Sequence, residues 1–340
     1  MTRLAISALP GSGSVIRDYV EAFDRLRDYY GRDPRAADTY TELAAHCDRR
    51  DYRRDALRSA LLGPLDRWGA PPGMRRRVEE LCGPRGLAVC TGQQTGLCGG
   101  PLFTVYKALT AVALAARLQR DLARPVVPLF WMASEDHDVA EADHIHLLDR
   151  GGRLVTIRHE AWGSPAGFMP ANLRLGPGIE DTLHRIWDAL PSTEFAEPLR
   201  ETLAAAYAPD HTLSDAFARW LCALLGETGL ILVDAADPAL KRLAGGVLRR
   251  EIAEAPRTST AIVEVSRRLR AQGYPAQIEA RPDGVNYFLL ADGRRALTRN
   301  ANGFAVRDTG DAISVSDLCR LADTSPERFS PNVALRPIVQ

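Results

Sequence analysis

The sequence has no excess of charge and no long apolar run. Its 43 basic residues balance 43 acidic residues, so no overall electrostatic attraction to nucleic acid is expected. No segment approaches the roughly 18 consecutive apolar residues of a membrane-spanning helix. The N-terminal Met1-Thr2-Arg3-Leu4 is not followed by a sustained apolar stretch, so we expect no signal peptide. These absences favour a soluble globular protein that has no nucleic acid and no membrane among its partners.

Cysteine is sparse and scattered along the chain. The six thiols lie far apart in sequence and form no C-x-x-C pair: Cys47, Cys82, Cys90, Cys98, Cys222 and Cys319. This spacing favours reduced thiols in a cytoplasmic protein over a disulfide framework or a zinc site.

Lysine is almost absent. Of the 43 basic residues only Lys107 and Lys241 are lysine, and the other 41 are arginine. Lys107 lies just inside the helix expected after a glycine-rich loop. Because the compact lysine ammonium differs from the planar guanidinium in geometry and hydration, we interpret Lys107 as a functional position that requires an ammonium.

Two apolar runs, at 87–90 and 126–133, are separated by one predicted helix that ends near Leu122. Such runs are typical of buried parallel strands in a strand-helix-strand unit. A third run, at 230–233, ends in Asp234, whose carboxylate could bind a ligand or cap the next helix. The sequence therefore predicts an α/β protein with a parallel sheet. Polar residues at the carboxyl ends of its strands would meet at the edge where open α/β sheets bind ligands.

The first polar cluster is a glycine-rich loop that leads into the predicted helix. Its residues of interest are Thr91, Gly92, Gln93, Gln94, Gly96, Gly99, Gly100 and Pro101. Glycines allow a close approach of the backbone to a ligand, and a helix N-terminus attracts anions. The spacing fits neither G-x-G-x-x-G nor the P-loop. We therefore predict a phosphate site of another kind, completed by Lys107.

The second polar cluster is Ser134-Glu135-Asp136-His137-Asp138. Three carboxylates beside one imidazole favour the imidazolium, which makes His137 a candidate proton donor or phosphate ligand. A divalent cation is an alternative, with Asp143, His144 and His146 nearby in sequence. A helix cap would explain Ser134 and one or two of the acids but not His137.

The remaining sequence predicts the domain organisation. Residues 1–84 form a helical region, with helices expected at 14–31, 39–62 and 71–82. The core has a first half at 85–160 and a second part at 211–275, separated by an inserted connecting region at 161–210. Regular Asp-Gly and Asn-Gly turn signals predict antiparallel hairpins within 276–340, followed by a return to the core.

Three strings together resemble the family that adds cysteine in the last step of bacillithiol synthesis (BshC). The first comprises Thr91-Gly92-Gln93-Gln94, Gly99-Gly100-Pro101 and Tyr106-Lys107, the second is the run from Phe130 to Asp138, and the third combines Phe329-Ser330-Pro331-Asn332-Val333 with Arg336-Pro337. The resemblance extends along the whole chain. It implies a Rossmann-like core with inserted connecting domains. It also implies a ligase that joins cysteine to glucosaminyl malate after a nucleotide activates the cysteine carboxylate.

The resemblance also assigns residues. It implies catalytic roles for His137, Lys107 and Asp136, and nucleotide contacts from Thr91, Gly92, Gln93, Gln94, Gly99, Gly100 and Ser134. Substrate contacts would come from Glu135, Asp138, Asn332 and Arg336. Asp234 is a further candidate substrate contact because it ends the third apolar run. ATP is the implied nucleotide, with Mg²⁺ as a candidate companion ion and no residue assigned as a metal ligand.

Members of the family continue beyond Arg336-Pro337 into a further core segment and a C-terminal coiled coil that makes a homodimer. We therefore expect weak or absent activity, and an incompletely covered sheet edge, in residues 1–340 alone. Two alternatives stay open from the sequence. One is a nucleotide- or phosphate-binding module without catalysis, and the other is a metal-dependent hydrolase that uses the acid and histidine cluster.

Overall fold

A computed structural model describes residues 5–135, 139–163, 169–291 and 293–339 of the chain. Its centre is a parallel sheet with the strand order β1-β2-β5. The strands are β1 (Leu87–Gln93), β2 (Val126–Met132) and β5 (Ile231–Asp234). In the described parts, no helix is both long and apolar enough to cross a membrane. The three apolar runs are thus strands of one sheet, and the predicted α/β fold is confirmed.

The register brings the ends of the three strands to one level. Gln93 pairs with Met132, and Met132 pairs with Asp234. The polar residues that follow β1 and β2 therefore lie at the same edge as Asp234. This edge is the place where a parallel α/β sheet is expected to bind ligands.

Helices pack on the sheet because their apolar stripes match its buried residues. The long helix α7 (Phe103–Leu122) contacts β1 and β2 and buries a row of small residues, Ala108, Ala111 and Ala115. Helices α6 (Pro72–Cys82) and α11 (Leu213–Leu225) supply apolar side chains to the main core around β2 and β5. Small residues on α7 let its axis approach the strands closely, which fixes the start of the helix next to the end of β1.

The N-terminal region is helical, but two of its predicted helices are interrupted. The expected helix at 14–31 consists of α1 (Ser14–Glu21), a 3₁₀ turn at Phe23–Leu26 and α2 (Arg27–Tyr30). The expected helix at 39–62 is divided into α3 (Thr39–Asp48) and α4 (Arg54–Leu62). The first interruption follows from Ala22, whose φ of −145° is not helical. The short helix α5 (Leu65–Trp68) precedes α6.

A second module, at 139–206, has a core of its own. Its helices are α8 (Val139–Ala142), α9 (Gly178–Ala189) and α10 (Ala196–Ala206). Its strands, β3 (His144–Leu148) and β4 (Leu154–Arg158), pair antiparallel with each other and not with the parallel sheet. The core of this module also takes in Leu97 and Tyr207, so it packs against the glycine-rich loop.

The C-terminal third contains helices and an antiparallel sheet with the order β10-β6-β7-β8-β9. The hairpins predicted from the turn signals are therefore confirmed. The strands are β6 (Tyr287–Leu290), β7 (Arg294–Asn300), β8 (Gly303–Val306), β9 (Ala312–Ile313) and β10 (Phe329–Pro331). The helices are α12 (Pro238–Lys241), α13 (Gly245–Ala253), α14 (Arg257–Ala271), α15 (Val315–Thr324) and α16 (Arg336–Val339).

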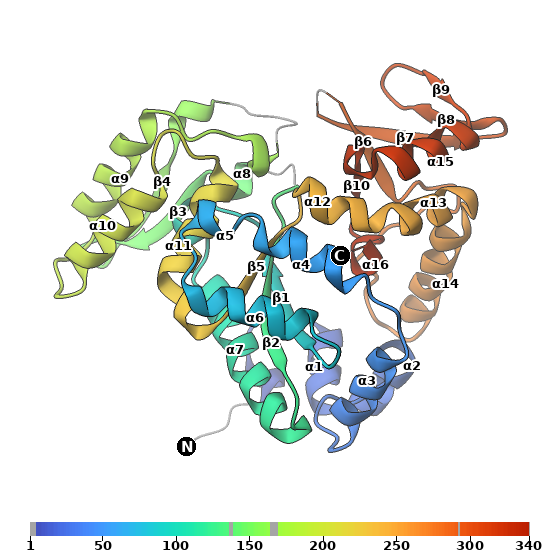
Figure 1. Ribbon diagram of the computed structural model, residues 1–340, viewed down its shortest axis with the longest axis horizontal. Coiled ribbons are helices and arrows are strands. Elements are labelled where there is room, and N and C mark those ends of the chain that lie inside the picture. The colour runs from blue at the N-terminus through green and yellow to red at the C-terminus, as the bar shows by residue number, and fades with distance from the viewer. Residues whose placement is uncertain (1–4, 136–138, 164–168, 292, 340) are drawn as a thin grey trace.

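Figure 1 shows how these parts are arranged. The parallel sheet lies in the middle, with the module of β3, β4, α9 and α10 on one side and the antiparallel sheet on the other. The N-terminal helices α1–α3 lie near α14, where Tyr274 donates a hydrogen bond of 2.7 Å to Asp18. The carboxyl edge of the parallel sheet therefore has a separate module on each flank.

Candidate functional site

The loop between β1 and α7 has a backbone that requires glycine. Gly99 and Gly100 have φ values of +91° and +71°, a region that side chains with a Cβ rarely adopt. A Cβ at Gly99 would also lie 3.0 Å from the Trp220 ring, and one at Gly96 would lie 3.2 Å from Gly100 Cα. The glycines singled out in the sequence thus allow a tight turn packed against α11.

Tyr207 holds this loop through two hydrogen bonds of its hydroxyl. Its hydroxyl accepts a hydrogen bond of 2.9 Å from the Gly99 N–H and donates one of 2.9 Å to the Gly96 carbonyl. Burial raises the pKa of Tyr207 well above its ordinary value, so the hydroxyl keeps the proton that it donates. Tyr207, whose ring packs in the core of the second module, therefore fixes the shape of the loop.

The start of α7 offers fewer free backbone donors than the sequence suggested. The N–H groups of Thr104 and Val105 donate to the carbonyls of Pro101 and Leu102, at 2.8 and 3.1 Å. The Gly100 N–H donates to Leu97 O at 2.9 Å. These turns satisfy donors that an anion would otherwise use, so side chains must contribute more of any phosphate site than we predicted.

Two buried hydroxyls flank the loop without a partner. The side chains of Thr95 and Thr104 are fully buried, and neither hydroxyl has a hydrogen-bond partner among the described residues. Buried polar groups nearly always have a partner in a protein or in an ordered water or ligand. These two hydroxyls are therefore polar groups beside the loop that could still accept a hydrogen-bonding partner.

Lys107 lies one turn into α7 and points back to the end of β1. Its Nζ is 3.1 Å from the side-chain oxygen of Gln93 and 5.7 Å from the centre of the Phe103 ring. The side chain is half-buried, and no carboxylate of the described residues forms an ion pair with it. An ammonium has three N–H donors, so Lys107 keeps donors for an anionic ligand.

Ser134 and Asp234 join the ends of β2 and β5. The Ser134 hydroxyl donates to Asp234 Oδ1, which also accepts from the Ala236 N–H at 2.9 Å. The Ser214 hydroxyl donates to Asp234 Oδ2 at 3.0 Å. Burial raises the pKa of Asp234, and the hydrogen bond from Ser134 opposes this rise. Both residues thus have internal partners, and their contacts with nucleotide or substrate stay predictions.

Glu135 is buried and has a partner that we did not predict. Its carboxylate forms an ion pair with Lys241 and lies 3.5 Å from the Ser330 hydroxyl. Lys241 is the second of the two lysines, so the scarcity that singled out Lys107 would have found it as well. The substrate contact of Glu135 stays a prediction.

The two predicted residues from the far end of the chain lie at a turn after β10. Asn332 Nδ2 donates to Asn286 Oδ1 at 3.1 Å, and Asn332 Oδ1 accepts from the N–H groups of Ala334 and Leu335. Arg336 begins α16. The side chain of Asn332 therefore shapes this turn, and its contact with substrate stays a prediction.

Asp136, His137 and Asp138 lie outside the described residues, so their predicted roles stay predictions. Their neighbours in sequence are engaged elsewhere. His144 Nδ1 lies 2.9 Å from Asp143 Oδ1, and His146 Nδ1 lies 2.8 Å from Thr156 Oγ1. In the part of the chain that the structure describes, no three His, Cys, Asp or Glu residues are grouped to hold a metal ion.

The described site is thus a set of side chains at one edge of the sheet. Gln93 and Lys107 lie at the end of β1, and Ser134 and Asp234 lie at the ends of β2 and β5. The Ala133 N–H donates to the Gln93 carbonyl at 2.9 Å, which places the two groups next to each other. The arrangement offers an ammonium and buried hydroxyls, a combination suited to an anionic ligand such as a phosphate.

Comparisons with known proteins give one consistent result. The model of a protein family described as "Bacillithiol biosynthesis BshC, N-terminal Rossmann-like domain" matches residues 2–340. The chain is 38% identical over 338 residues to a protein of Salinibacter ruber and 39% identical over 320 residues to one of Chlorobaculum tepidum. A protein of Koribacter versatilis is 34% identical over 345 residues. All three carry the name "Putative cysteine ligase BshC".

These alignments cover 99%, 93% and 99% of this chain, but 61%, 56% and 62% of the relatives. The chain therefore spans about three fifths of the length of the curated relatives that it matches. With the parallel sheet and the three matching strings, the comparisons identify the chain as a member of the BshC family that contains its N-terminal Rossmann-like domain.

Proposed function

We propose that the protein acts as a ligase in bacillithiol biosynthesis. It joins the carboxylate of L-cysteine to the amino group of glucosaminyl malate in the last step, at the expense of ATP. The names of the relatives and the three shared strings support this proposal. Reduced thiols at all six cysteines fit the cytoplasm as its compartment.

The observation that carries the proposal is the position of Lys107. Its ammonium lies at the carboxyl edge of the parallel sheet, beside Gln93 and without a carboxylate partner among the described residues. A cation in this place stabilises the charge that develops when a phosphoryl or adenylyl group is transferred. The buried hydroxyls of Thr95 and Thr104 offer further polar contacts near the same loop.

The chemistry requires an activated carboxylate. When bound, ATP supplies a phosphoryl or adenylyl group that makes the cysteine carboxylate reactive toward an amine. Lys107 would hold the negative charge of the phosphates, and Gln93 would orient the Lys107 ammonium. His137 would move a proton as the amide forms, and Ser134 with Asp234 would hold the ends of β2 and β5 in place. No step is assigned to Mg²⁺, although an ion bound to the phosphates fits the proposal.

The test uses the longest natural version of the chain. It is mixed with ATP, Mg²⁺, cysteine and glucosaminyl malate, and bacillithiol is sought by mass spectrometry. We expect product that requires ATP and forms about 10- to 100-fold more slowly in Lys107→Ala. Tight nucleotide binding without product would favour a binding module instead. Metal-dependent hydrolysis that survives in Lys107→Ala would favour the hydrolase alternative, and either outcome would contradict the ligase proposal.

A further inference from the structure

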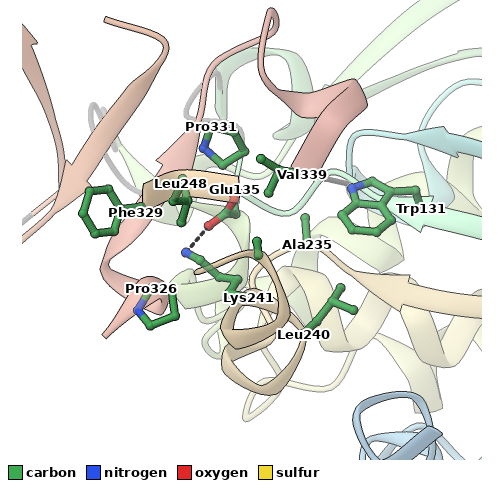
Figure 2. A pocket seen from close by; sticks show the side chains of 11 residues that line it. Trp131, Glu135, Ala235, Leu240, Lys241, Leu248, Pro326, Phe329, Pro331 and Val339 are labelled. Atoms are coloured by element: carbon green, nitrogen blue, oxygen red, sulfur yellow. Dashed lines mark hydrogen bonds and ion pairs between the residues drawn. The ribbon is translucent and has the colours of Figure 1, made fainter. Parts of the chain in front are cut away.

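A buried ion pair lies between the parallel sheet and the antiparallel sheet. Glu135 follows β2 and is 2% exposed, and Lys241 ends α12 and is 9% exposed. Figure 2 shows the carboxylate and the ammonium pointing toward each other, with Phe329 and Pro326 on one side and Trp131 on the other. Charged side chains are rarely this buried unless they are paired, so each residue depends on the other.

Three separate segments meet at the Glu135 carboxylate. Lys241 approaches from α12, and the Ser330 hydroxyl lies 3.5 Å from Glu135 Oε2 on the β10 side. β10 in turn pairs with β6 of the antiparallel sheet. The carboxylate thus links the carboxyl end of β2 to a strand about 195 positions later in the chain.

The local charges explain why this link needs Lys241. Burial raises the pKa of Glu135, whereas Lys241 and Arg294 lower it and Asp234 raises it further. Without the Lys241 ammonium, Glu135 would be a buried carboxylate with one direct cationic partner fewer. Such a group either takes up a proton or moves toward water, and both changes would loosen its contact with Ser330.

The surroundings also explain why the residue is a lysine. The space left beside the pair is about 20 Å³, which is room for about one water molecule. Its walls are mostly apolar, with Ala235, Leu240 and Ala244 among the lining residues. A planar guanidinium is bulkier than an ammonium and carries five donors to satisfy. This chain uses arginine at 41 of its 43 basic positions. We therefore attribute the lysine at position 241 to the small volume of the site and to the few hydrogen-bond acceptors in it.

We propose that Lys241 is a positioning residue: it fixes Glu135 and thereby ties the carboxyl end of β2, where the site lies, to β10 of the antiparallel sheet. The catalytic consequence of this tie rests on the proposed ligase function. The tie itself does not, and it can be measured without any reaction.

The test is hydrogen exchange followed by mass spectrometry on the full natural chain. Lys241→Met keeps nearly the same side-chain length but removes the charge. We expect exchange to become about tenfold faster in peptides covering 126–135 and 326–335, because local opening is no longer opposed by the pair. Peptides of the β3–β4 hairpin should be unchanged. Arg249→Met is the matched control, since it removes an exposed ion pair to Asp323 in the same C-terminal part.

A second variant keeps the test decisive if Lys241→Met does not fold. Glu135→Gln combined with Lys241→Met leaves no unpaired buried charge and should fold, but the tie is still lost. Faster exchange at 326–335 in the double variant supports the proposal. Exchange equal to that of the parent chain, in either variant that folds, overturns it.

Activity gives an independent readout. A positioning role predicts that Lys241→Met lowers kcat about 10- to 100-fold, as misplaced groups do, while KM for ATP stays within about twofold of the parent. A parent chain without ligase activity would refute the proposed function. The hydrogen-exchange result would then still show whether Lys241 links the end of β2 to β10. Unchanged kcat despite faster exchange would show that Lys241 does not position the site.

Discussion

The ammonium of Lys107 and the side-chain oxygen of Gln93 are 3.1 Å apart, although the two residues come from different elements. Gln93 ends β1, and Lys107 lies in the second turn of α7, so the contact spans the glycine-rich loop. A hydrogen bond from an ammonium to a neutral amide orients the cation without neutralising it. The relationship therefore explains how the chain can present a positive charge at the edge of the sheet.

Replacing this charge should affect catalysis more than folding. We expect Lys107→Ala to lower kcat/KM for ATP about 10- to 100-fold, because a hydrogen bond to a charged group is worth about 1.5–3 kcal/mol. The melting temperature should change little, since Lys107 is half-buried and has no carboxylate partner among the described residues. Arg117→Ala is the control on the same helix, where an exposed ion pair with Asp121 is lost. Equal effects of the two changes on kcat/KM would contradict a phosphate role for Lys107.

The hydroxyl of Tyr207 should matter through the loop that it supports. Tyr207→Phe removes one oxygen and leaves the Gly96 carbonyl without this buried donor. We expect a loss of about 1–3 kcal/mol in the free energy of unfolding, measured by urea denaturation, together with weaker ATP binding. Tyr30→Phe, at a residue that is 53% exposed, is the matched control and should leave both unchanged. ATP affinity equal to that of the parent chain would show that loop geometry does not set nucleotide binding.

The backbone of Gly99 should tolerate no side chain. Gly99→Ala places a Cβ at a φ of +91° and 3.0 Å from Trp220, and we expect a loss of about 1–3 kcal/mol in stability. Gly73→Ala offers the opposite case, because Gly73 lies in α6 with open space around it. That change should stabilise the protein by about 0.5–1 kcal/mol. Thermal unfolding should show a lower melting temperature for Gly99→Ala and a higher one for Gly73→Ala. Stabilisation by Gly99→Ala would refute the description of the loop.

His159 should make the second module sensitive to acid. It is 1% exposed, with Nε2 2.9 Å from Leu175 O and Nδ1 2.9 Å from Thr182 Oγ1. Burial lowers the pKa of His159, so the folded state favours the neutral ring. A lowered folded pKa means that stability is fully present above the unfolded pKa of about 6.5 and is lost as the pH falls through the folded value.

Urea denaturation at several pH values tests whether acid lowers the stability of the protein through His159. When the pH falls from 7.5 to below about 6.5, the free energy of unfolding should decrease more in the parent chain than in His159→Gln. The variant lacks the imidazole ring that titrates. His184→Gln, at an exposed position of α9, serves as the control and should follow the parent. If His159→Gln also follows the parent, the buried ring does not cause the acid sensitivity.

Much of the sheet and part of the site could be predicted from the sequence. Three apolar runs that end in polar residues indicate parallel strands, because burial on both faces removes the alternation of half-exposed strands. Their shared edge follows from the parallel direction. The structure places Gln93, Ser134 and Asp234 at this edge, with Lys107 bonded to Gln93. Their roles toward a ligand stay predictions.

Other features depend on contacts between distant parts of the chain, which local patterns do not reveal. The apolar positions from Ile16 to Tyr30 fit one continuous helix, yet Phe23 and Leu26 are buried in a 3₁₀ turn. The partner of Glu135 lies 106 positions away, and the tyrosine beneath the glycine loop lies 108 positions from Gly99. Such partners are set by packing between modules. For Lys241 a compositional signal existed, because it is one of two lysines in an arginine-rich chain.

The scarcity of lysine also provides the most direct test of the phosphate site. An acylating reagent for amines, applied to the full natural chain and followed by peptide mass spectrometry, reports on Lys107 and Lys241 separately. Lys107 is half-buried and should react, whereas the buried Lys241 should react slowly. We predict that saturating ATP slows acylation of Lys107 at least severalfold and leaves Lys241 unaffected. Acylation of Lys107 at the same rate with and without ATP would contradict the assignment of Lys107 to the nucleotide phosphates.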